Sequence, residues 1–273
     1  MDNKYAKLLD KYNSILAKNS HDPYNRAVLA RIYMKENKFE EAEDNYSLIL
    51  QNNPEYPEAL YMMGFLSMKK RRYSLAIDYF KQLISIGKAN SFVYEYISIL
   101  DRENRSEYLE KALEQAKSAK IRPKDYKRCA YMAFQSFVWK EYNIALEYAN
   151  LAYNAKQTND IINLLGCIYH YNEDYDKALS FFHEVNANYE GGNSYVLCNI
   201  ASCYRKKNSN KMAVRYLEKA REVDSDDKLI YYNIGSIYAV TGNKKLAYEN
   251  FEKALEIDEN YKEARRALES VKE

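Results

Sequence analysis

The stretch LIYYNIGSIYAVTGNKKLAYENFEKALEID, residues 229–258, decides the fold of this chain. Gly235 lies twelve residues before Ala247, and Phe251 follows Ala247 by four. Apolar residues on either side of these markers recur every three or four residues, which is the spacing of an amphipathic helix. The stretch therefore predicts two helices, each carrying a small residue on its apolar face.

The second half of this pattern recurs along the chain as an alanine followed four residues later by an apolar or aromatic residue. The spacings of the alanines are 34, 69, 33, 35 and 34 residues, and 69 corresponds to two repeats. These alanines are Ala42, Ala76, Ala145, Ala178, Ala213 and Ala247. A period of 33–36 residues indicates a solenoid of helical hairpins.

The first half of the pattern recurs with equal regularity. A small residue lies twelve positions before each alanine, and a large apolar residue precedes it: Leu29-Ala30, Met63-Gly64, Met132-Ala133, Leu165-Gly166, Ile200-Ala201 and Ile234-Gly235. With the tyrosines three residues later in four of these units, the pattern resembles the tetratricopeptide repeat. The resemblance covers residues 23–261 and is carried by six of seven repeats.

The resemblance implies an all-α fold: a right-handed superhelical α-solenoid of about seven helix-turn-helix units with N- and C-terminal capping helices. We expect the small residue of the first helix to face the small residue of the second, so that the two axes approach closely. Aromatic side chains would fill the gaps between neighbouring hairpins. The predicted divisions are a helix at 1–22, repeats at 23–56, 57–90, 91–125, 126–158, 159–193, 194–227 and 228–261, and a capping helix at 262–273.

The third repeat, 91–125, is degenerate. Ala112 continues the alanine series, but the matching position of the first helix holds Leu100, and Ser98 is two residues out of place. The apolar N-terminal helix has two interpretations, as half a repeat that packs on the array or as an element that mediates self-association.

Composition and motifs argue against several classes of protein. The net charge of +2 is too balanced for a general binder of nucleic acid or membrane surfaces. No apolar stretch is long enough to span a bilayer, so we expect a cytoplasmic protein without membrane insertion. We find no catalytic constellation, no motif for a cofactor and no metal-ligand set, since His170 and His183 lack a third placed ligand.

The function then depends on the surface that the first helices line. In the family that this sequence resembles, these helices form a groove that holds an extended or helical partner segment. The matching positions form an aromatic zone and a polar zone, comprising Tyr61, Phe65, Met68, Tyr131, Phe134 and Phe137, and Asn199, Arg205 and Asn233. The rings either mark an exposed partner site or belong to the ordinary core.

Two further surface predictions follow from the residues. The positions matching the family's chaperone-binding carboxylate clamp hold Ala27, Arg31 and Met62, so we expect no binding of that motif. Cations gather in the turns between the two helices of a repeat, at Lys69, Lys70, Arg71, Arg72 and Lys206. They either complement the C-terminal ends of helices or form a basic edge that meets an acidic partner.

The main prediction is a non-catalytic scaffold or adaptor that binds a peptide or protein segment in the groove. One alternative is binding of RNA or another anionic polymer along the basic edge. Another is an assembly subunit of a larger complex, held through the N-terminal helix. The sequence does not name the partner.

Overall fold

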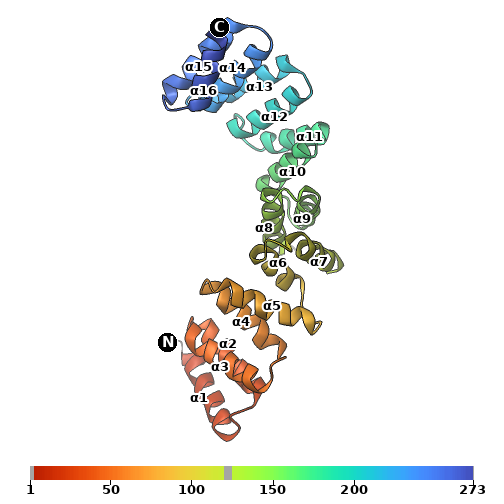
Figure 1. Cartoon of the computed structure of the whole chain (residues 1–273), viewed down its shortest axis with the longest axis vertical. Coiled ribbons are helices and arrows are strands. Elements are labelled where there is room, and N and C mark those ends of the chain that lie inside the picture. Colours follow the sequence, from red (N-terminus) through yellow and green to blue (C-terminus); the bar gives the residue numbers. More distant parts are fainter. Residues whose placement is uncertain (1–2, 120–124, 273) are drawn as a thin grey trace. The chain divides into compact units, whose positions relative to one another are not determined.

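The computed structural model describes residues 3–119 and 125–272, and this part of the chain contains helices and no strands (Figure 1). The helices are α1 (Asn3–Lys18), α2 (Pro23–Lys35), α3 (Phe39–Asn52), α4 (Pro57–Lys69), α5 (Tyr73–Ser85), α6 (Ser91–Leu100), α7 (Arg105–Ser118), α8 (Tyr126–Val138), α9 (Tyr142–Ala155), α10 (Asn159–Tyr171), α11 (Tyr175–Ala187), α12 (Ser194–Lys206), α13 (Asn210–Val223), α14 (Lys228–Val240), α15 (Lys244–Ile257) and α16 (Lys262–Lys272).

These helices form hairpins that pack in chain order, which confirms the prediction of an all-α array of helix-turn-helix units. The chain divides into two compact units, Met1–Lys120 and Ile121–Glu273. We call them unit 1, which contains α1 to α7, and unit 2, which contains α8 to α16. The predicted boundary between the third and fourth repeats lies between residues 125 and 126, and residues 120–124, just before it, lie outside the described part. The division into seven repeats stays a prediction.

Most of the hairpin turns share one local structure. The third residue beyond the end of the first helix donates its backbone N–H to the carbonyl of the residue five positions earlier, as Asn243 does to Tyr238 at 2.9 Å and Ser209 to Tyr204 at 2.8 Å. The preceding residue adopts a left-handed conformation, with φ of 81° at Gly242 and 57° at Asn208. This is a Schellman-type end, and it satisfies carbonyls that the helix leaves without partners. The hairpin of α6 and α7 differs, because residues 101–104 connect it without a left-handed residue.

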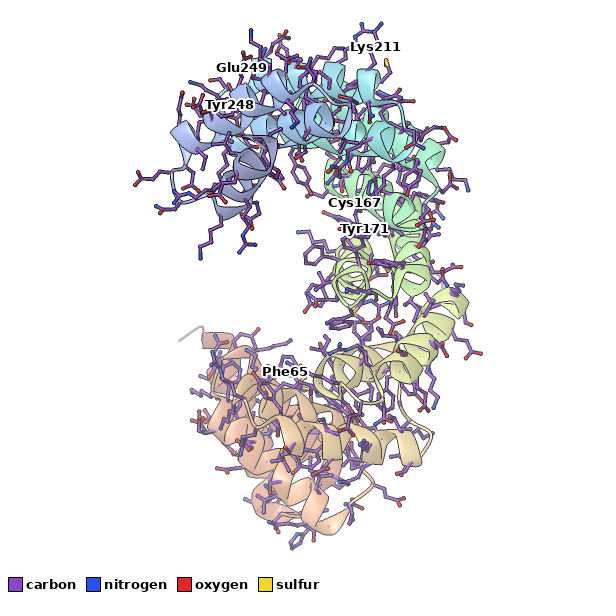
Figure 2. All side chains as sticks on the ribbon, turned by 45° about the horizontal axis from the view of Figure 1, so that its top comes forward. Phe65, Cys167, Tyr171, Lys211, Tyr248 and Glu249 are labelled. Carbon is purple, nitrogen blue, oxygen red and sulfur yellow. The ribbon has the colours of Figure 1, made fainter. Side chains whose placement is uncertain are left out.

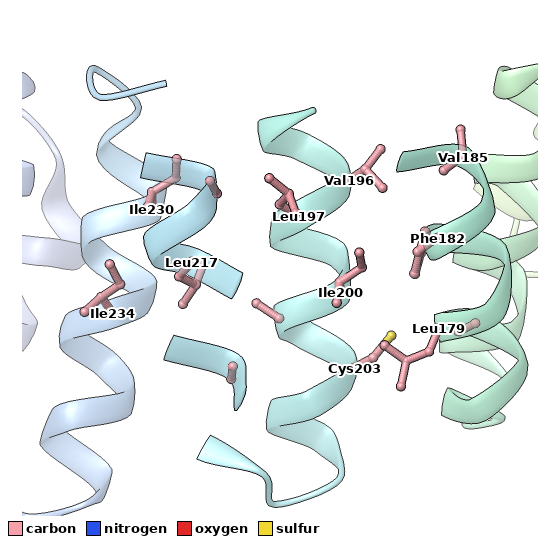
Figure 3. Packing of buried hydrophobic residues seen from close by; sticks show 14 of the residues in the cluster. Leu179, Phe182, Val185, Val196, Leu197, Ile200, Cys203, Leu217, Ile230 and Ile234 are labelled. Atoms are coloured by element: carbon pink, nitrogen blue, oxygen red, sulfur yellow. The ribbon is translucent and has the colours of Figure 1, made fainter. Parts of the chain in front are cut away.

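The core of unit 2 shows how the hairpins pack on one another. One face of α12 carries Val196, Ile200 and Cys203 toward α11, whose Phe182 and Val185 are buried against them (Figure 3). Leu197, on another face of α12, packs in the same cluster as Leu217 of α13 and Ile230 and Ile234 of α14. Each first helix is therefore covered on two sides, and its remaining face is left for the surface.

The small residue of the first helix has a closer neighbour than the one we expected. A Cβ added to Gly64 would lie 2.5 Å from the ring of Phe80, and one added to Gly166 would lie 2.6 Å from the ring of Phe182. At Gly235 the nearest atom is in the ring of Phe251, at 2.7 Å, and the carbonyl oxygen of Ala247 follows at 3.2 Å. At Gly235 the small residue does face Ala247 of the second helix, as expected, but the ring of the phenylalanine four residues further along lies closer still.

Glycine and phenylalanine therefore occur together in this chain. The three repeats with glycine on the first helix carry phenylalanine sixteen residues later. The repeats with Ala30, Ala133 and Ala201 carry Tyr46, Ala149 and Leu217 instead. A phenylalanine ring at this position therefore goes with glycine on the first helix, whereas the buried ring of Tyr46 is accommodated opposite Ala30.

In the third repeat, a serine is the small residue at the close contact between the two helices. Ser98 is fully buried and is the eighth residue of α6, as Gly64 is the eighth residue of α4, whereas Leu100 is only half-buried. Ser98 is therefore the small residue, and its hydroxyl donates a hydrogen bond to the carbonyl of Glu95 at 2.7 Å. On α7 the residue four beyond Ala112 is Ala116, so no ring enters this hairpin.

The two terminal helices pack on their own units. In α1, Leu16 is buried, but Tyr5, Leu8 and Leu9 are only half-buried beside α2. In α16, Ala264 and Leu268 are buried against α14 and α15. No helix in residues 3–119 or 125–272 combines the length and the apolar content that a membrane span requires.

The ring contact makes a stability prediction at Gly235. A glycine-to-alanine change inside a helix normally stabilises by about 1 kcal/mol. We expect Gly235→Ala to destabilise instead, by about 1–3 kcal/mol, because the new methyl group overlaps the ring of Phe251. The free energy of unfolding from urea denaturation followed by circular dichroism measures the change.

A second variant tests the cause. The double variant Gly235→Ala/Phe251→Leu reproduces the pair found at Ala201 and Leu217, and we expect it to be more stable than Gly235→Ala alone. If Phe251→Leu instead lowers the free energy of unfolding further, by the full cost of the cavity it creates, the ring of Phe251 is not what destabilises Gly235→Ala.

Candidate functional site

Unit 2 has an apolar pocket between α8, α10 and α12, with a volume of about 360 Å³. Phe134, which is 52% exposed, and Phe137 lie on its α8 side, while Tyr195 closes it from α12. The lining residues are Ala130, Phe134, Phe137, Asp160, Ile161, Asn163, Leu164, Cys167 and Tyr195. The pocket is large enough for one apolar side chain.

The periodicity of α8 explains why its rings face outward. Cys129, Met132 and Ser136 are buried on one side of the helix. Tyr131 and Phe134 therefore fall on the opposite side, where they are about half exposed, at 49% and 52%. An exposed aromatic surface of this kind is a recognised feature of partner sites.

A polar pocket of about 220 Å³ lies next along the chain, between α12, α13 and α14. It is lined by Cys198, Asn199, Ala201, Ser202, Arg205, Leu217, Asn233 and Ile237. Asn199 and Asn233 are 34 residues apart, and each precedes the small residue of its helix by two positions. The repeat thus places both amides, with Arg205, in one pocket.

Two amide atoms near these pockets have no hydrogen-bond partner. They are Oδ1 of Asn163, in the apolar pocket, and Nδ2 of Asn199, in the polar pocket, and both are shielded from solvent. Asn199 comes close enough to oppose the rise in the pKa of Tyr195 that burial causes, but its Nδ2 makes no hydrogen bond of normal geometry. An unsatisfied buried polar group costs about 1–3 kcal/mol.

His170 lies at the end of α10 beside the polar pocket. Its Nε2 is 3.0 Å from the hydroxyl oxygen of Ser202. The rings of Tyr171 and Tyr175 lie edge-on to it, at 5.6 and 5.5 Å between centroids. Burial lowers the pKa of His170, and the cations Lys206 and Arg205 lower it further. The neutral imidazole is therefore the favoured form in the folded chain.

Sequence reasoning missed several residues of this surface. Asn163 and Tyr195 were not among the predicted groove residues, although Tyr195 precedes Asn199 by four positions and so shares its helix face. Cys167 lies four residues before Tyr171 on α10, and Figure 2 shows both on that helix. Burial raises the pKa of the Cys167 thiol to about 11, so this cysteine is a lining group and not a nucleophile.

The candidate residues of unit 1 make more contacts within the chain. The rings of Tyr61 and Phe65 each lie 6.4 Å from that of Tyr96, and both residues are half-buried. Burial raises the pKa of Tyr61. Met68 is also half-buried and packs on the core around Phe80. The aromatic zone thus splits into a packed part on α4 and an exposed part on α8.

Most cations of the basic turn of unit 1, residues 69–72, already contact other side chains of unit 1. Lys70 contacts Glu43 at 2.6 Å, and Arg72 contacts the other oxygen of the same carboxylate. Burial opposes ionisation of Glu43, but these two cations outweigh it and lower its pKa. The ammonium of Lys69 lies 4.4 Å from the ring centroid of Phe39, and Arg71 is the left-handed residue of the turn. Lys206, in unit 2, is exposed.

Within residues 3–119 and 125–272, no three His, Cys, Asp or Glu side chains come together in positions suited to a metal ion. His183 faces the ring of Tyr216, at 5.7 Å between centroids, and His170 has the partners described above. The two histidines therefore lie in different local environments.

The helical hairpins, with their recurring small residues and shared turns, define an α-helical repeat protein. Three family models described as tetratricopeptide repeat match residues 28–91, 194–227 and 229–261. The chain is therefore a tetratricopeptide-repeat protein, as its sequence predicts. None of the curated proteins matches it.

Solved structures share this fold. The C-terminal part of a TPR repeat-containing protein from Cytophaga hutchinsonii matches over 88% of this chain and 98% of that chain, with 18% identity and a TM-score of 0.61. The APC/C hetero-tetramer Cut9–Hcn1 matches over 99% of this chain and 46% of that chain, with 16% identity and a TM-score of 0.48. This chain thus spans less than half of the length of that relative.

A shorter match is the first TPR of Spaghetti bound to an HSP90 peptide, which covers 42% of this chain and 90% of that chain at 19% identity, with a TM-score of 0.39. At 18% identity, the similarity to the Cytophaga hutchinsonii protein shows the fold alone. Tetratricopeptide repeats in general support a role as a protein-interaction scaffold, and proteins built from them are generally non-catalytic.

The pKa of His170 makes a prediction about stability. Because the folded state holds this pKa below 6.5, stability is fully present above pH 6.5 and is lost as the pH falls through the folded-state value. We expect the free energy of unfolding to fall below pH 6.5 and the loss to be smaller in His170→Gln.

His183 acts in the same direction, because burial and then Lys219 lower its pKa. The double variant His170→Gln/His183→Gln should therefore show the flattest dependence between pH 7.5 and 5.5 in urea denaturation. An unchanged slope in the double variant would show that neither histidine resists protonation in the folded chain.

The ion pairs of Glu43 make a prediction about the basic turn. Replacing Glu43 by Gln releases Lys70 and Arg72 from their shared partner. We expect Glu43→Gln to elute from heparin at higher salt than wild type, because two cations become available to the polymer.

The exposed Glu55 gives a matched control, since Glu55→Gln changes the net charge equally. If both variants elute together, the shift comes from net charge and the turn is not specially restrained by Glu43.

Proposed function

We propose that this protein is a non-catalytic adaptor that binds an extended segment of a protein partner on the surface of α8, α10, α12 and α14 in unit 2. This surface consists of the apolar pocket and the polar pocket described above, and we call it the unit 2 groove. The observation that carries the proposal is the apolar pocket beside the exposed ring of Phe134, followed along the chain by a polar pocket that holds Asn199, Asn233 and Arg205.

The geometry of the first helices favours an extended segment. α10 lies beside both α8 and α12, so the two pockets follow one another across neighbouring helices. An extended backbone exposes N–H and C=O groups at regular intervals, and asparagine side chains can both donate to and accept from them. The aromatic and aliphatic lining provides apolar area for side chains of the segment.

The residues present do not favour a catalytic interpretation. His170 and Ser202 are within hydrogen-bond distance, but among residues 3–119 and 125–272 no carboxylate is seen to orient the imidazole. We therefore assign this pair to the wall of the groove. We also retain the prediction that the chaperone carboxylate clamp is missing, since Arg31, at one of its positions, pairs with Glu58 at 3.2 Å.

Binding of RNA or another anionic polymer along the basic edge is less well supported. Lys70 and Arg72 already share Glu43, and Lys69 lies over Phe39. Self-association through α1 stays an untested alternative, which measurement of the mass in solution with and without residues 1–18 would resolve. A cytoplasmic location likewise stays a prediction.

The test of the proposed function is selection from a displayed library of random peptides. We expect the wild-type chain to retain a subset of the library, and Phe134→Ala/Asn199→Ala/Asn233→Ala to lose at least tenfold of that retention, since apolar burial and amide hydrogen bonds disappear together.

Tyr24→Ala is the matched control, because Tyr24 is an exposed aromatic of unit 1, at 64%. It should retain the same peptides as wild type. Equal retention by the triple variant would place binding outside the unit 2 groove, and retention of no peptide by wild type would refute peptide binding.

A further inference from the structure

The two pockets of the unit 2 groove share one helix. Tyr195, near the start of α12, lines the apolar pocket, and Arg205, near its end, lines the polar pocket. Asn199 and Ser202 lie between them, at intervals of three or four residues, and so follow the same side of the helix. One partner segment that follows α12 would therefore meet an apolar environment first and a polar one second.

Charge is distributed unevenly along this path. Arg205 and Lys206 form no ion pair recorded in the described part of unit 2, and both act on His170 as unbalanced positive charge. At the other end, Asp160 lines the apolar pocket. The carboxylates Asp224 and Asp227 add to the rise in the pKa of Cys198 that burial causes, and Cys198 lines the polar pocket seven residues before Arg205 on α12. Within the polar pocket, an anionic group is therefore favoured beside Arg205 and Lys206 and not beside Cys198.

The length of α12 between the two pockets limits the spacing of the groups that bind. Tyr195 and Arg205 are ten residues apart, which corresponds to about 15 Å along a helix. An extended peptide advances about 3.3 Å per residue, so about four or five residues cover this length.

We propose that the partner segment is an extended acidic peptide. It places an apolar side chain in the apolar pocket and, about four or five residues away, an Asp or Glu side chain against Arg205 and Lys206. This inference rests on the proposed function of the unit 2 groove and adds the chemistry of the ligand. Arg205 supplies a planar group that can bind a carboxylate through two parallel hydrogen bonds.

The anionic group belongs to a side chain and not to the end of the partner chain. Asn233 and Ile237 of α14 line the polar pocket together with Arg205, so a segment that continues past Arg205 can also contact α14. An internal stretch of a partner protein makes both contacts, which a chain end at Arg205 does not require.

The test is selection on the full chain from a library of heptapeptides displayed as internal segments, so that no free carboxyl terminus is present. We expect the selected peptides to be enriched in Asp or Glu four or five positions from an apolar residue. The same selection with Arg205→Gln/Lys206→Gln should lose that enrichment.

The outcomes separate this inference from the proposed function. Recovery of peptides without acidic enrichment, or with enrichment that persists in the charge variant, overturns the inference and leaves groove binding intact. Recovery only from a library with free carboxyl termini overturns the side-chain assignment. Recovery of no peptide from either library overturns groove binding and this inference together.

Affinity measurements on one selected peptide then test the contact itself. We expect replacement of its acidic residue by the amide to weaken binding about tenfold, and Arg205→Gln/Lys206→Gln to do the same, with little further loss when both changes are combined. Lys211→Gln is the matched control, because Lys211 is an exposed cation on α13 outside the polar pocket (Figure 2).

An independent readout is the pKa of His170, followed by NMR during titration with the same peptide. A carboxylate at Arg205 and Lys206 offsets the positive charge that lowers this pKa, so the value should rise on binding. The amide form of the peptide should leave it near the free value. Equal shifts with both peptides would contradict the carboxylate contact.

Discussion

The structure depends on one close contact, between the eighth residue of the first helix in a hairpin and the side chain that faces it from the second helix. Where that side chain is a phenylalanine ring, as at Phe80, Phe182 and Phe251, the first helix carries glycine. Where the facing residue is Ala149, Leu217 or the buried Tyr46, the first helix carries alanine. This complementarity holds the two helices together, and it fixes which faces of the first helix remain for contact with neighbours and with solvent.

The surface of unit 2 follows from that constraint. Because α12 buries one face against α11 and another against the hairpin of α13, its stripe from Tyr195 to Lys206 stays accessible. Residues on that stripe contribute little to the core, so core packing does not restrict which residue types occur there. The unpartnered amide atoms of Asn163 and Asn199 are a cost to folding.

The two units use similar residues for different ends. Aromatic side chains on α4 pack on one another around Tyr96, whereas those on α8 remain exposed beside the apolar pocket. Cations behave in the same way. Lys70 and Arg72 share Glu43, while Arg205 and Lys206 form no recorded ion pair within the described residues. Residues of the same kind on corresponding helices or turns therefore do not have the same role in the two units, because their neighbours differ.

The sequence by itself determined the helical hairpins and the family, because a period of 33–36 residues with small residues at fixed offsets permits few other folds. It also indicated that Asn199 and Asn233 occupy equivalent positions in two successive repeats. Only the tertiary structure decided that Ser98 replaces Leu100 as the small residue, that the rings face the glycines, and that Asn163 and Tyr195 join the groove. The reason is that local periodicity assigns a residue to a helix face, whereas its burial and its partners depend on side chains more than thirty residues away.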